Sequence, residues 1–557
     1  MATLVGESSV KGGPEVVRMT LLTFAAIGIT YACSPFTALP LSFVLARRFT
    51  WGIEMTYCTP YLLTLGLTKS NTSLIWIAGP LSGLIVQPVV GVLSDEHTSK
   101  WGRRRPLMVA GAVVAAVSLL VLGYTREIVG LVMRGDEQSK MPTIVLAVLA
   151  IYVVDFAINA VMSCARSLIV DILPLEKQQA GAAWSSRMSA VGHMVGYAAG
   201  SVDLVKVFGT TLGDAQFQQL TVIAALSIVG STAVTCLAVT EKVLVSTKEA
   251  KRHPIKNVAG QIYTTLRHLP PRIQAICWAQ FWSWIGWFPF LFYGTTWVGE
   301  TYFRYDVPPE AKQSKDALGD MGRIGSTALL VYSVVTFVGA FALPLLVKSP
   351  ADEAAKMSHP SVAVAGAGGT WRKRRPDLVM TWIGGQLLFA AAMSMAPLAR
   401  SFRFATILLC LCGLPWTIAL WAPTALLGVE VNKLSGASYQ RLDEEPDIEL
   451  PTVHPNDAAD CAEEADASGT STTAELSGIY FGILNIYTTL PQFVGTFIAS
   501  IVFTILEPGK SPELSDDAPA ADKGASSGKT NAISVCLFIG AICSVVATFA
   551  TRKLHYL

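Results

Sequence analysis

Three polar residues in one apolar segment have the types and spacing needed to bind a proton and a polar solute. Asp155 lies near the middle of the run 142–172, Asn159 follows four residues later and Arg166 eleven residues later. At about 100° and 1.5 Å per residue, both offsets return close to one face of a helix, and Arg166 lies about 16 Å from Asp155. Ionisable side chains at membrane depth mark functional sites by default. We expect Asp155 and Arg166 to line one water-accessible cavity at two depths. The alternative is a pair of structural charges that neighbouring helices satisfy.

The same residues suggest a proton-transfer step. Burial favours the neutral form of a carboxyl group, and a nearby cation favours the ionised form. Asp155 could therefore take up a proton on one side and release it when the cavity opens toward Arg166. A proton-coupled symporter requires this chemistry. The sequence suggests no enzyme, because it shows no metal site, no nucleotide phosphate site and no nucleophilic triad. We expect no cofactor, only the proton as coupling ion.

Five further residues in apolar runs are candidates for contact with the solute: Glu54, Gln87, Trp287, Asn485 and Gln492. A sugar would suit them, since its ring has an apolar face for an aromatic side chain and hydroxyls for amides and carboxylates. Each also has a plainer interpretation. Glu54 could be an interfacial charge, Gln87 a packing residue, and Trp287 part of an aromatic belt. Asn485 and Gln492, seven residues apart on one helix face, could join helices.

The elements that position these residues must be membrane helices. Of the 557 residues, 52% are hydrophobic and only 15% are charged, whereas a soluble domain has about 25% charged residues. The net charge of +2 excludes a strongly basic nucleic-acid binder. A spanning helix needs about 20 apolar residues. Twelve runs meet this need: 19–67 (anomalous), 72–94, 107–124, 142–172, 180–203, 219–240, 273–297, 324–347, 378–397, 403–428, 476–505 and 532–550.

The distribution of Lys and Arg orients these spans. Basic residues concentrate in the connections between spans 2 and 3, 6 and 7, and 8 and 9, which places both termini in the cytoplasm. The predicted divisions are a cytoplasmic N-terminus (1–18), an N-terminal half (19–240), a cytoplasmic linker (241–272), a C-terminal half (273–550) and a cytoplasmic C-terminus (551–557). The acidic loop 434–475 and the outer loop 507–531 have compositions that cannot bury a core, so we expect them to be disordered.

A basic hexapeptide occurs at the same place in each half. Trp101–Pro106 reads Trp-Gly-Arg-Arg-Arg-Pro, and Trp371–Pro376 reads Trp-Arg-Lys-Arg-Arg-Pro. Ordinary positive-inside anchors could explain both, but the matching ends favour a duplication. Two parallel six-helix halves form the arrangement of the major facilitator superfamily. The predicted fold is therefore an all-α membrane protein of the major facilitator type, with twelve transmembrane helices.

The first hexapeptide resembles the loop 2–3 signature of that superfamily. Its expected gating residues are Gly91, Asp95, Gly102, Arg103, Arg104 and Arg105. Asp95 is expected at a helix end, where the arginines can pair with it. Such a charge cluster can stabilise one conformation and release another, which a two-state transporter needs.

Taken together, the chain resembles the sucrose–proton symporters, the glycoside branch of the superfamily. The resembling stretches are Ala78–Gly91, Gly102–Pro106, Asp155–Asp171, Val191–Gly200, Trp287–Phe290 and Gly482–Asn485, and Trp51–Tyr57 is most similar to fungal sucrose and maltose carriers. The resemblance implies that Asp155 is the proton- and sugar-binding carboxylate and that Arg166 is the essential arginine. Ile158 and His193 depart from residues common in plant members, which leaves sugar selectivity open.

The resemblance implies proton-coupled symport of a disaccharide, sucrose or a maltose-type α-glucoside, by a monomer in a lipid bilayer. The expected membrane is the plasma membrane, with the vacuolar membrane as the alternative. Two other functions stay open. One is a monosaccharide carrier or vacuolar exporter of the same fold, and the other is a sugar sensor that does not transport.

The first apolar region, 19–67, is too long for one span and is interrupted by Arg47 and Arg48. Removing residues 31–48 joins Leu21–Thr30 directly to Phe49–Leu65 and restores one clean span. The removed piece is in frame, and its ends can be encoded with intron-like junctions. We hypothesise that residues 31–48 are a retained intron, which the sequence of the transcript would test.

Overall fold

The computed structural model describes residues 3–5, 9–10, 17–22, 54–95, 97–133, 136–173, 188, 191–241, 243–245, 263–306, 317–347, 375–443, 458–509 and 531–557. The proposed insertion 31–48 lies outside these residues, as does most of the second basic hexapeptide and of the loop 507–531. Nearly all described residues are helical. This is the expected solution in lipid, where a helix satisfies its backbone hydrogen bonds within one segment.

Nine of the expected spans are confirmed as helices long and apolar enough to cross a membrane, within the part of the chain that the structure describes. They are formed by α4 (Lys69–Ile75) with α5 (Ala78–Asp95), α6 (Arg105–Gly123), α8 (Asp136–Ile172), α11 (Gln216–Ala238), α14 (Ala317–Leu346), α16 (Leu378–Ser394), α17 (Phe402–Leu411) with α18 (Gly413–Asp443), α19 (Ala458–Leu506) and α21 (Ala532–Arg552).

Helical segments also occupy the places of the other three expected spans. The long helix α13 (Pro271–Thr301) stands at the seventh. The π-helix η1 (Glu54–Cys58) with α3 (Thr59–Thr64) stands at the first, and residues 191–201 stand at the fifth. The total of twelve stays a prediction. Shorter helices are α7 (Thr125–Val132), α10 (Leu204–Phe208), η2 (Tyr302–Asp306), η4 (Ala396–Leu398) and η6 (Lys553–His555).

Four short strands tie the start of the chain to the end of α11, a feature that the all-α prediction did not include. The strand β1 (Thr3–Val5) pairs antiparallel with β4 (Val243–Val245), and β2 (Ser9–Val10) pairs with β3 (Val239–Thr240). The predicted cytoplasmic N-terminus 1–18 therefore lies beside the end of the predicted N-terminal half and the start of the linker.

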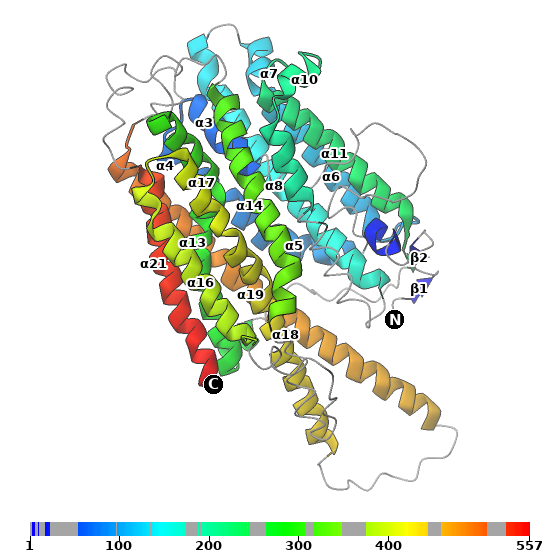
Figure 1. The fold of residues 1–557 in the computed structure, drawn as a ribbon. Coiled ribbons are helices and arrows are strands. Elements are labelled where there is room, and N and C mark those ends of the chain that lie inside the picture. The colour runs from blue at the N-terminus through cyan, green and yellow to red at the C-terminus, as the bar shows by residue number, and fades with distance from the viewer. Residues whose placement is uncertain are drawn as a thin grey trace.

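The helices form an elongated bundle in which the two predicted halves lie side by side (Figure 1). Both chain termini lie at one end, which we call the terminal end. The opposite end, where α3, α4, α7 and α10 lie, we call the distal end. Within the halves, α6 packs on α8 and α11, and α13 packs on α21 and α19. Between the halves, α4 packs on α19, and η1 packs on α13 and α14.

The helices α18 and α19 extend beyond the bundle at the terminal end (Figure 1). Of the stretch 434–475 that was expected to be a disordered loop, α18 continues to Asp443 and α19 begins at Ala458, and residues 444–457 lie outside the described residues. Both extensions continue a membrane helix, so their formation requires no new helix nucleation. The α19 extension is also rich in Ala and Glu, which favour helix.

A buried group of charges joins the two halves at the distal end. We call it the distal ionic cluster: Lys69, Glu300, Arg304, Glu507 and Asn531. Lys69 Nζ lies 2.6 Å from Glu300 Oε1 and also pairs with Glu507. Arg304 Nη2 lies 3.0 Å from Glu507 Oε1, and Asn531 Nδ2 donates to Glu300 Oε2 at 2.9 Å. Lys69 belongs to the N-terminal half and the other four to the C-terminal half, so the cluster holds the distal end closed.

Removing the bridging cation should destabilise this closed end. We expect Lys69→Met to lower the free energy of unfolding by about 3–5 kcal/mol, because two buried carboxylates would share one arginine. Thermal unfolding of the purified protein in detergent measures the effect. The control is Lys206→Met, which removes a largely exposed pair with Asp203 and should cost less than about 1 kcal/mol. Equal losses in the two variants would contradict the structural role of the cluster.

The dependence of stability on pH in the acid range should also reveal the contribution of Glu507. Burial alone would raise the pKa of Glu507, but Lys69 and Arg304 outweigh it and lower the pKa to about 2. A carboxyl whose pKa is depressed in the folded state stabilises the protein above its unfolded value of 4.5. That contribution is lost as the pH falls through this value toward about 2. The difference in melting temperature between the protein and Glu507→Gln should therefore be constant above about pH 5 and shrink below about pH 4. A difference that changes between neutral pH and about pH 5 would contradict this.

Candidate functional site

The continuous helix α8 carries the three residues with which the sequence argument began. Asp155 is buried, with only 4% of its surface exposed, and Arg166 is exposed. No break occurs between them, so they are separated by eleven residues of regular helix, or about 16 Å. A direct ion pair between them is excluded in this conformation. The expectation of one cavity at two depths stays a prediction.

Asn159 joins α8 to α5 through a short chain of hydrogen bonds. Its Oδ1 accepts from Gln87 Nε2 at 2.9 Å, and its Nδ2 donates to Ser82 Oγ at 2.8 Å. One turn farther along, Ser163 Oγ donates to the carbonyl of Gln87 at 3.1 Å. Both amides are only partly buried, so they stay accessible while these bonds fix their orientation. The structure thus brings together Gln87 and Asn159, two of the expected solute-binding residues, beside Asp155.

Glu54, at the start of η1, lies near Asp155. Glu54 is 4% exposed, and its Oε1 and Oε2 have no hydrogen-bond partner; the same is true of Asp155 Oδ2. The two carboxyl groups are near enough to interact electrostatically. The sequence named each of them separately and gave no sign that η1 would bring them together.

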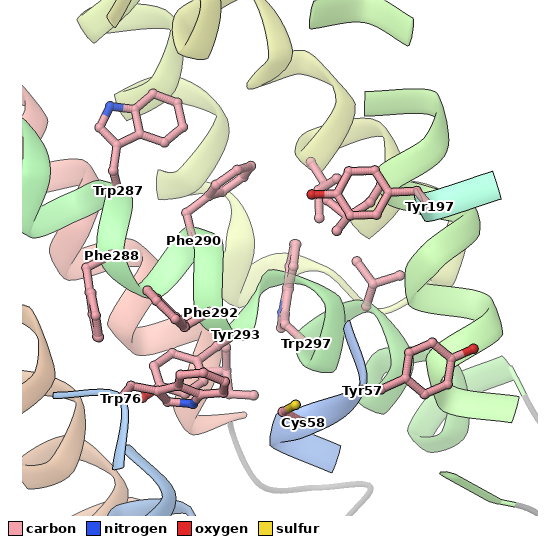
Figure 2. Packing of buried hydrophobic residues seen from close by; sticks show 14 of the residues in the cluster. Tyr57, Cys58, Trp76, Tyr197, Trp287, Phe288, Phe290, Phe292, Tyr293 and Trp297 are labelled. Carbon is pink, nitrogen blue, oxygen red and sulfur yellow. The ribbon is translucent and has the colours of Figure 1, made fainter. Parts of the chain in front are cut away.

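Trp287 does not face these acids. It is 2% exposed and packs against aromatic residues of the C-terminal half, with ring centroids 4.3 Å from Phe389 and 5.0 Å from Trp416. Figure 2 shows it at one end of a row of aromatic side chains on α13, and Trp297 farther along the helix, near Cys58. The ring of Trp287 is thus packed among other rings in this conformation, and its assignment to the solute stays a prediction.

Among the described residues, Asn485 and Gln492 on α19 take no part in the hydrogen-bond network of Gln87 and Asn159. Asn485 is exposed, and Gln492 Nε2 donates to the carbonyl of Thr488 on its own helix at 3.0 Å. Their assignment to the solute stays a prediction. Within the described residues, no group of three or more His, Cys, Asp or Glu side chains could hold a metal ion.

At the terminal end, the arginines of the first hexapeptide pair with Asp171 at the end of α8. Arg103 Nη2 lies 2.8 Å from Asp171 Oδ1, and Arg104 Nε lies 2.9 Å from Asp171 Oδ2. Arg104 also donates to Ser94 near the end of α5. Sequence reasoning did not identify Asp171 as a partner of these arginines. Asp95 was expected to be the partner, and its side chain lies outside the described residues.

Glu241, directly after β3, is the residue that sequence reasoning missed. Its carboxylate accepts the backbone N–H groups of Arg103, Arg104 and Arg105 at 2.9–3.0 Å, and it lies 3.4 Å from Arg105 Nε. Its position in the sequence could have suggested this role, because it is an acid immediately after the sixth apolar run, at the membrane level of the basic hexapeptide. Its position anchors the turn that begins α6 to the end of the half.

Comparisons with known proteins show the family to which the chain belongs. Residues 39–307 match the family model of MFS/sugar transport proteins. The General alpha-glucoside permease of Schizosaccharomyces pombe is 30% identical, with 92% of each chain covered. The Sucrose transport protein SUC4 of Arabidopsis thaliana is 28% identical over 70% of this chain and 76% of its own.

Solved structures give the fold alone. A bacterial homologue of the human lysosomal transporter Spinster, inward-facing and unoccupied, superposes with a TM-score of 0.53 at 12% identity and covers 97% of this chain and 96% of its own. A D-xylose–proton symporter gives a TM-score of 0.50 at 12% identity, covering 96% of this chain and 97% of its own. The structural neighbours thus have the major facilitator fold that the sequence predicted.

The turn that Glu241 anchors should tolerate no side chain at Gly102. The backbone there has φ of +105°, and a Cβ would lie 2.7 Å from Glu241 side-chain atoms. We expect Gly102→Ala to destabilise the protein by about 1–3 kcal/mol, because of backbone strain and displacement of Glu241. Thermal unfolding measures this loss. The matched control is Gly130→Ala on α7, where nothing lies within 4 Å and the change should be neutral or stabilising. Equal losses would contradict the proposed anchor.

Proposed function

Because the chain belongs to the MFS/sugar transport protein family, we propose that this sugar permease carries an α-glucoside, sucrose or a maltose-type disaccharide, together with a proton. The supporting observation is the arrangement around Asp155. A buried carboxyl group with an unpartnered oxygen lies beside two oriented amides, Gln87 and Asn159. Sugar hydroxyls both donate and accept hydrogen bonds, so the carboxylate and the amides complement them.

The proposed mechanism is alternating access between the two halves. In this structure the distal ionic cluster closes one end of the bundle. The positive-inside rule makes the terminal end cytoplasmic, so the described conformation would face inward. We assign Asp155 as the group that carries the proton and contacts the sugar. We assign Arg166, exposed nearer the terminal end, as the cation that favours ionised Asp155 when water reaches it.

The basic hexapeptide and its acids would brace the N-terminal half during the change of access. The ion pairs of Arg103 and Arg104 with Asp171 connect the start of α6 to α8, and Glu241 connects it to α11. They hold the N-terminal half rigid at its terminal end while the halves rotate. We propose a monomer in the plasma membrane with both termini cytoplasmic, as the family resemblance and the distribution of basic residues suggest.

Labelled sugar uptake in transporter-deficient yeast tests the function. We expect uptake of labelled sucrose or maltose to be several-fold faster at about pH 5 than at about pH 7, because the proton is a co-substrate. Asp155→Asn should abolish this pH dependence and lower accumulation at least about tenfold, because its amide cannot exchange a proton. The control Asp214→Asn changes an exposed carboxylate in the loop before α11 and should transport normally.

Two outcomes would contradict the proposal. Uptake that is insensitive to pH and to Asp155→Asn would exclude Asp155 as the proton carrier. Absence of uptake for every disaccharide and monosaccharide, in a protein that reaches the membrane, would favour a sugar sensor.

A further inference from the structure

The two buried acids, Glu54 and Asp155, come from separate helical segments and share one apolar environment. Tyr57 and Cys58, which follow Glu54, belong to the same buried hydrophobic cluster as Val154 and Ile158, which flank Asp155. Each acid is 4% exposed. Three of their four carboxyl oxygens are fully buried and make no hydrogen bond. These three oxygens are therefore dehydrated in this conformation.

No cation compensates these carboxyl groups within the described residues. Their electrostatic partners are each other, Cys58 and Tyr152, and ordinary thiols and phenols are neutral near pH 7. On the segments packed against them, charges lie only toward the helix ends. These residues are Asp95 on α5, Arg105 on α6, Arg126 and Glu127 on α7, Arg272 and Glu300 on α13, and Asp320 and Arg323 on α14. Residues 191–201 add the titratable side chain of His193.

Several of these end charges have partners of their own. Arg105 pairs with Glu241, and Arg323 pairs with Asp320 and Asp203. Glu300 belongs to the distal ionic cluster. None of them supplies a counter-charge to the two acids.

Two ionised carboxylates cannot be neighbours in such a place. Each would lose its hydration without a counter-ion, and the two would repel each other. One bound proton removes both problems, since the carboxylic acid of one residue can donate a hydrogen bond to the other. Sites that interact this strongly bind protons as a pair.

We propose that Glu54 and Asp155 hold one shared proton while the distal end is closed, which makes Glu54 a second proton-coupling residue. The inference rests on the proposed symport and deepens it. The proton is then bound by two helical segments, η1 and α8. Its release requires these segments to separate or water to reach the two carboxyl groups. A sugar hydroxyl would then replace the missing donor at the ionised carboxylate.

Infrared difference spectroscopy on the purified protein in nanodiscs tests the pair without requiring transport. The carbonyl band of a protonated carboxyl group is followed as pH is raised. We expect this band in the unmodified protein near pH 7, and we expect it to disappear about one pH unit or more lower in both Glu54→Gln and Asp155→Asn. Each variant removes the like charge that keeps the other residue protonated. A band in Glu54→Gln that titrates as in the unmodified protein would overturn the proposal.

Sugar uptake against pH provides the functional readout. Glu54→Gln should move the pH of half-maximal uptake about one unit lower, because Asp155 would then lose its proton more easily. Glu54→Asp keeps a carboxyl group and should keep the original profile. The control Glu127→Gln removes a carboxylate that accepts a hydrogen bond from Gln218 on α11, and its profile should not move.

The outcomes separate the pair from the transport function. A Glu54→Gln variant with a weaker apparent sugar affinity and an unchanged pH profile would make Glu54 a sugar contact and overturn the shared proton. If no sugar is transported by any form, the symport proposal fails, and the infrared titration still decides whether the two acids share a proton.

Discussion

A charge in an apolar interior needs an opposite charge, hydrogen-bond donors or a proton, and this requirement organises the whole molecule. The structure meets it in three ways along the bundle. At the distal end, Lys69 and Arg304 balance Glu300 and Glu507. At the terminal end, arginines and backbone N–H groups surround Asp171 and Glu241. Between them, no described cation lies beside Glu54 and Asp155, so a proton is the remaining solution.

The three solutions differ in what can break them. Fixed opposite charges separate only when the helices that carry them separate, so the distal ionic cluster responds to movement of the halves. The terminal network lies within one half and can keep its partners while the halves move. A proton can leave Glu54 and Asp155 without separation of the helices, provided that water reaches the two carboxyl groups. The charges at the ends thus depend on the positions of the helices, whereas the acids in the middle of the bundle couple proton binding to conformation.

Much of this molecule could be predicted from its sequence. In a membrane, the hydropathy of a segment and the need to hydrogen-bond its backbone internally largely determine where helices form. The nine confirmed spans followed from apolar runs, and the shared face of Asp155 and Asn159 followed from helical geometry. Contacts between distant segments could not be predicted. Glu241 lies more than a hundred residues from the arginines it anchors, and Glu54 about a hundred from Asp155. The environment of Trp287 could not be predicted either, since an aromatic residue suits a sugar and a packed core equally well.

The pairing of β1 with β4 and of β2 with β3 makes the N-terminal half a nearly closed loop of chain. The segments that precede and follow it are held together at the terminal end, beside Glu241, before the chain passes to the second half. Such a unit has the geometry of an independently folding module. The connection after β4 is thus a natural place to divide the protein into two co-expressed fragments, whose reassembly would be guided by the helix contacts at the distal end.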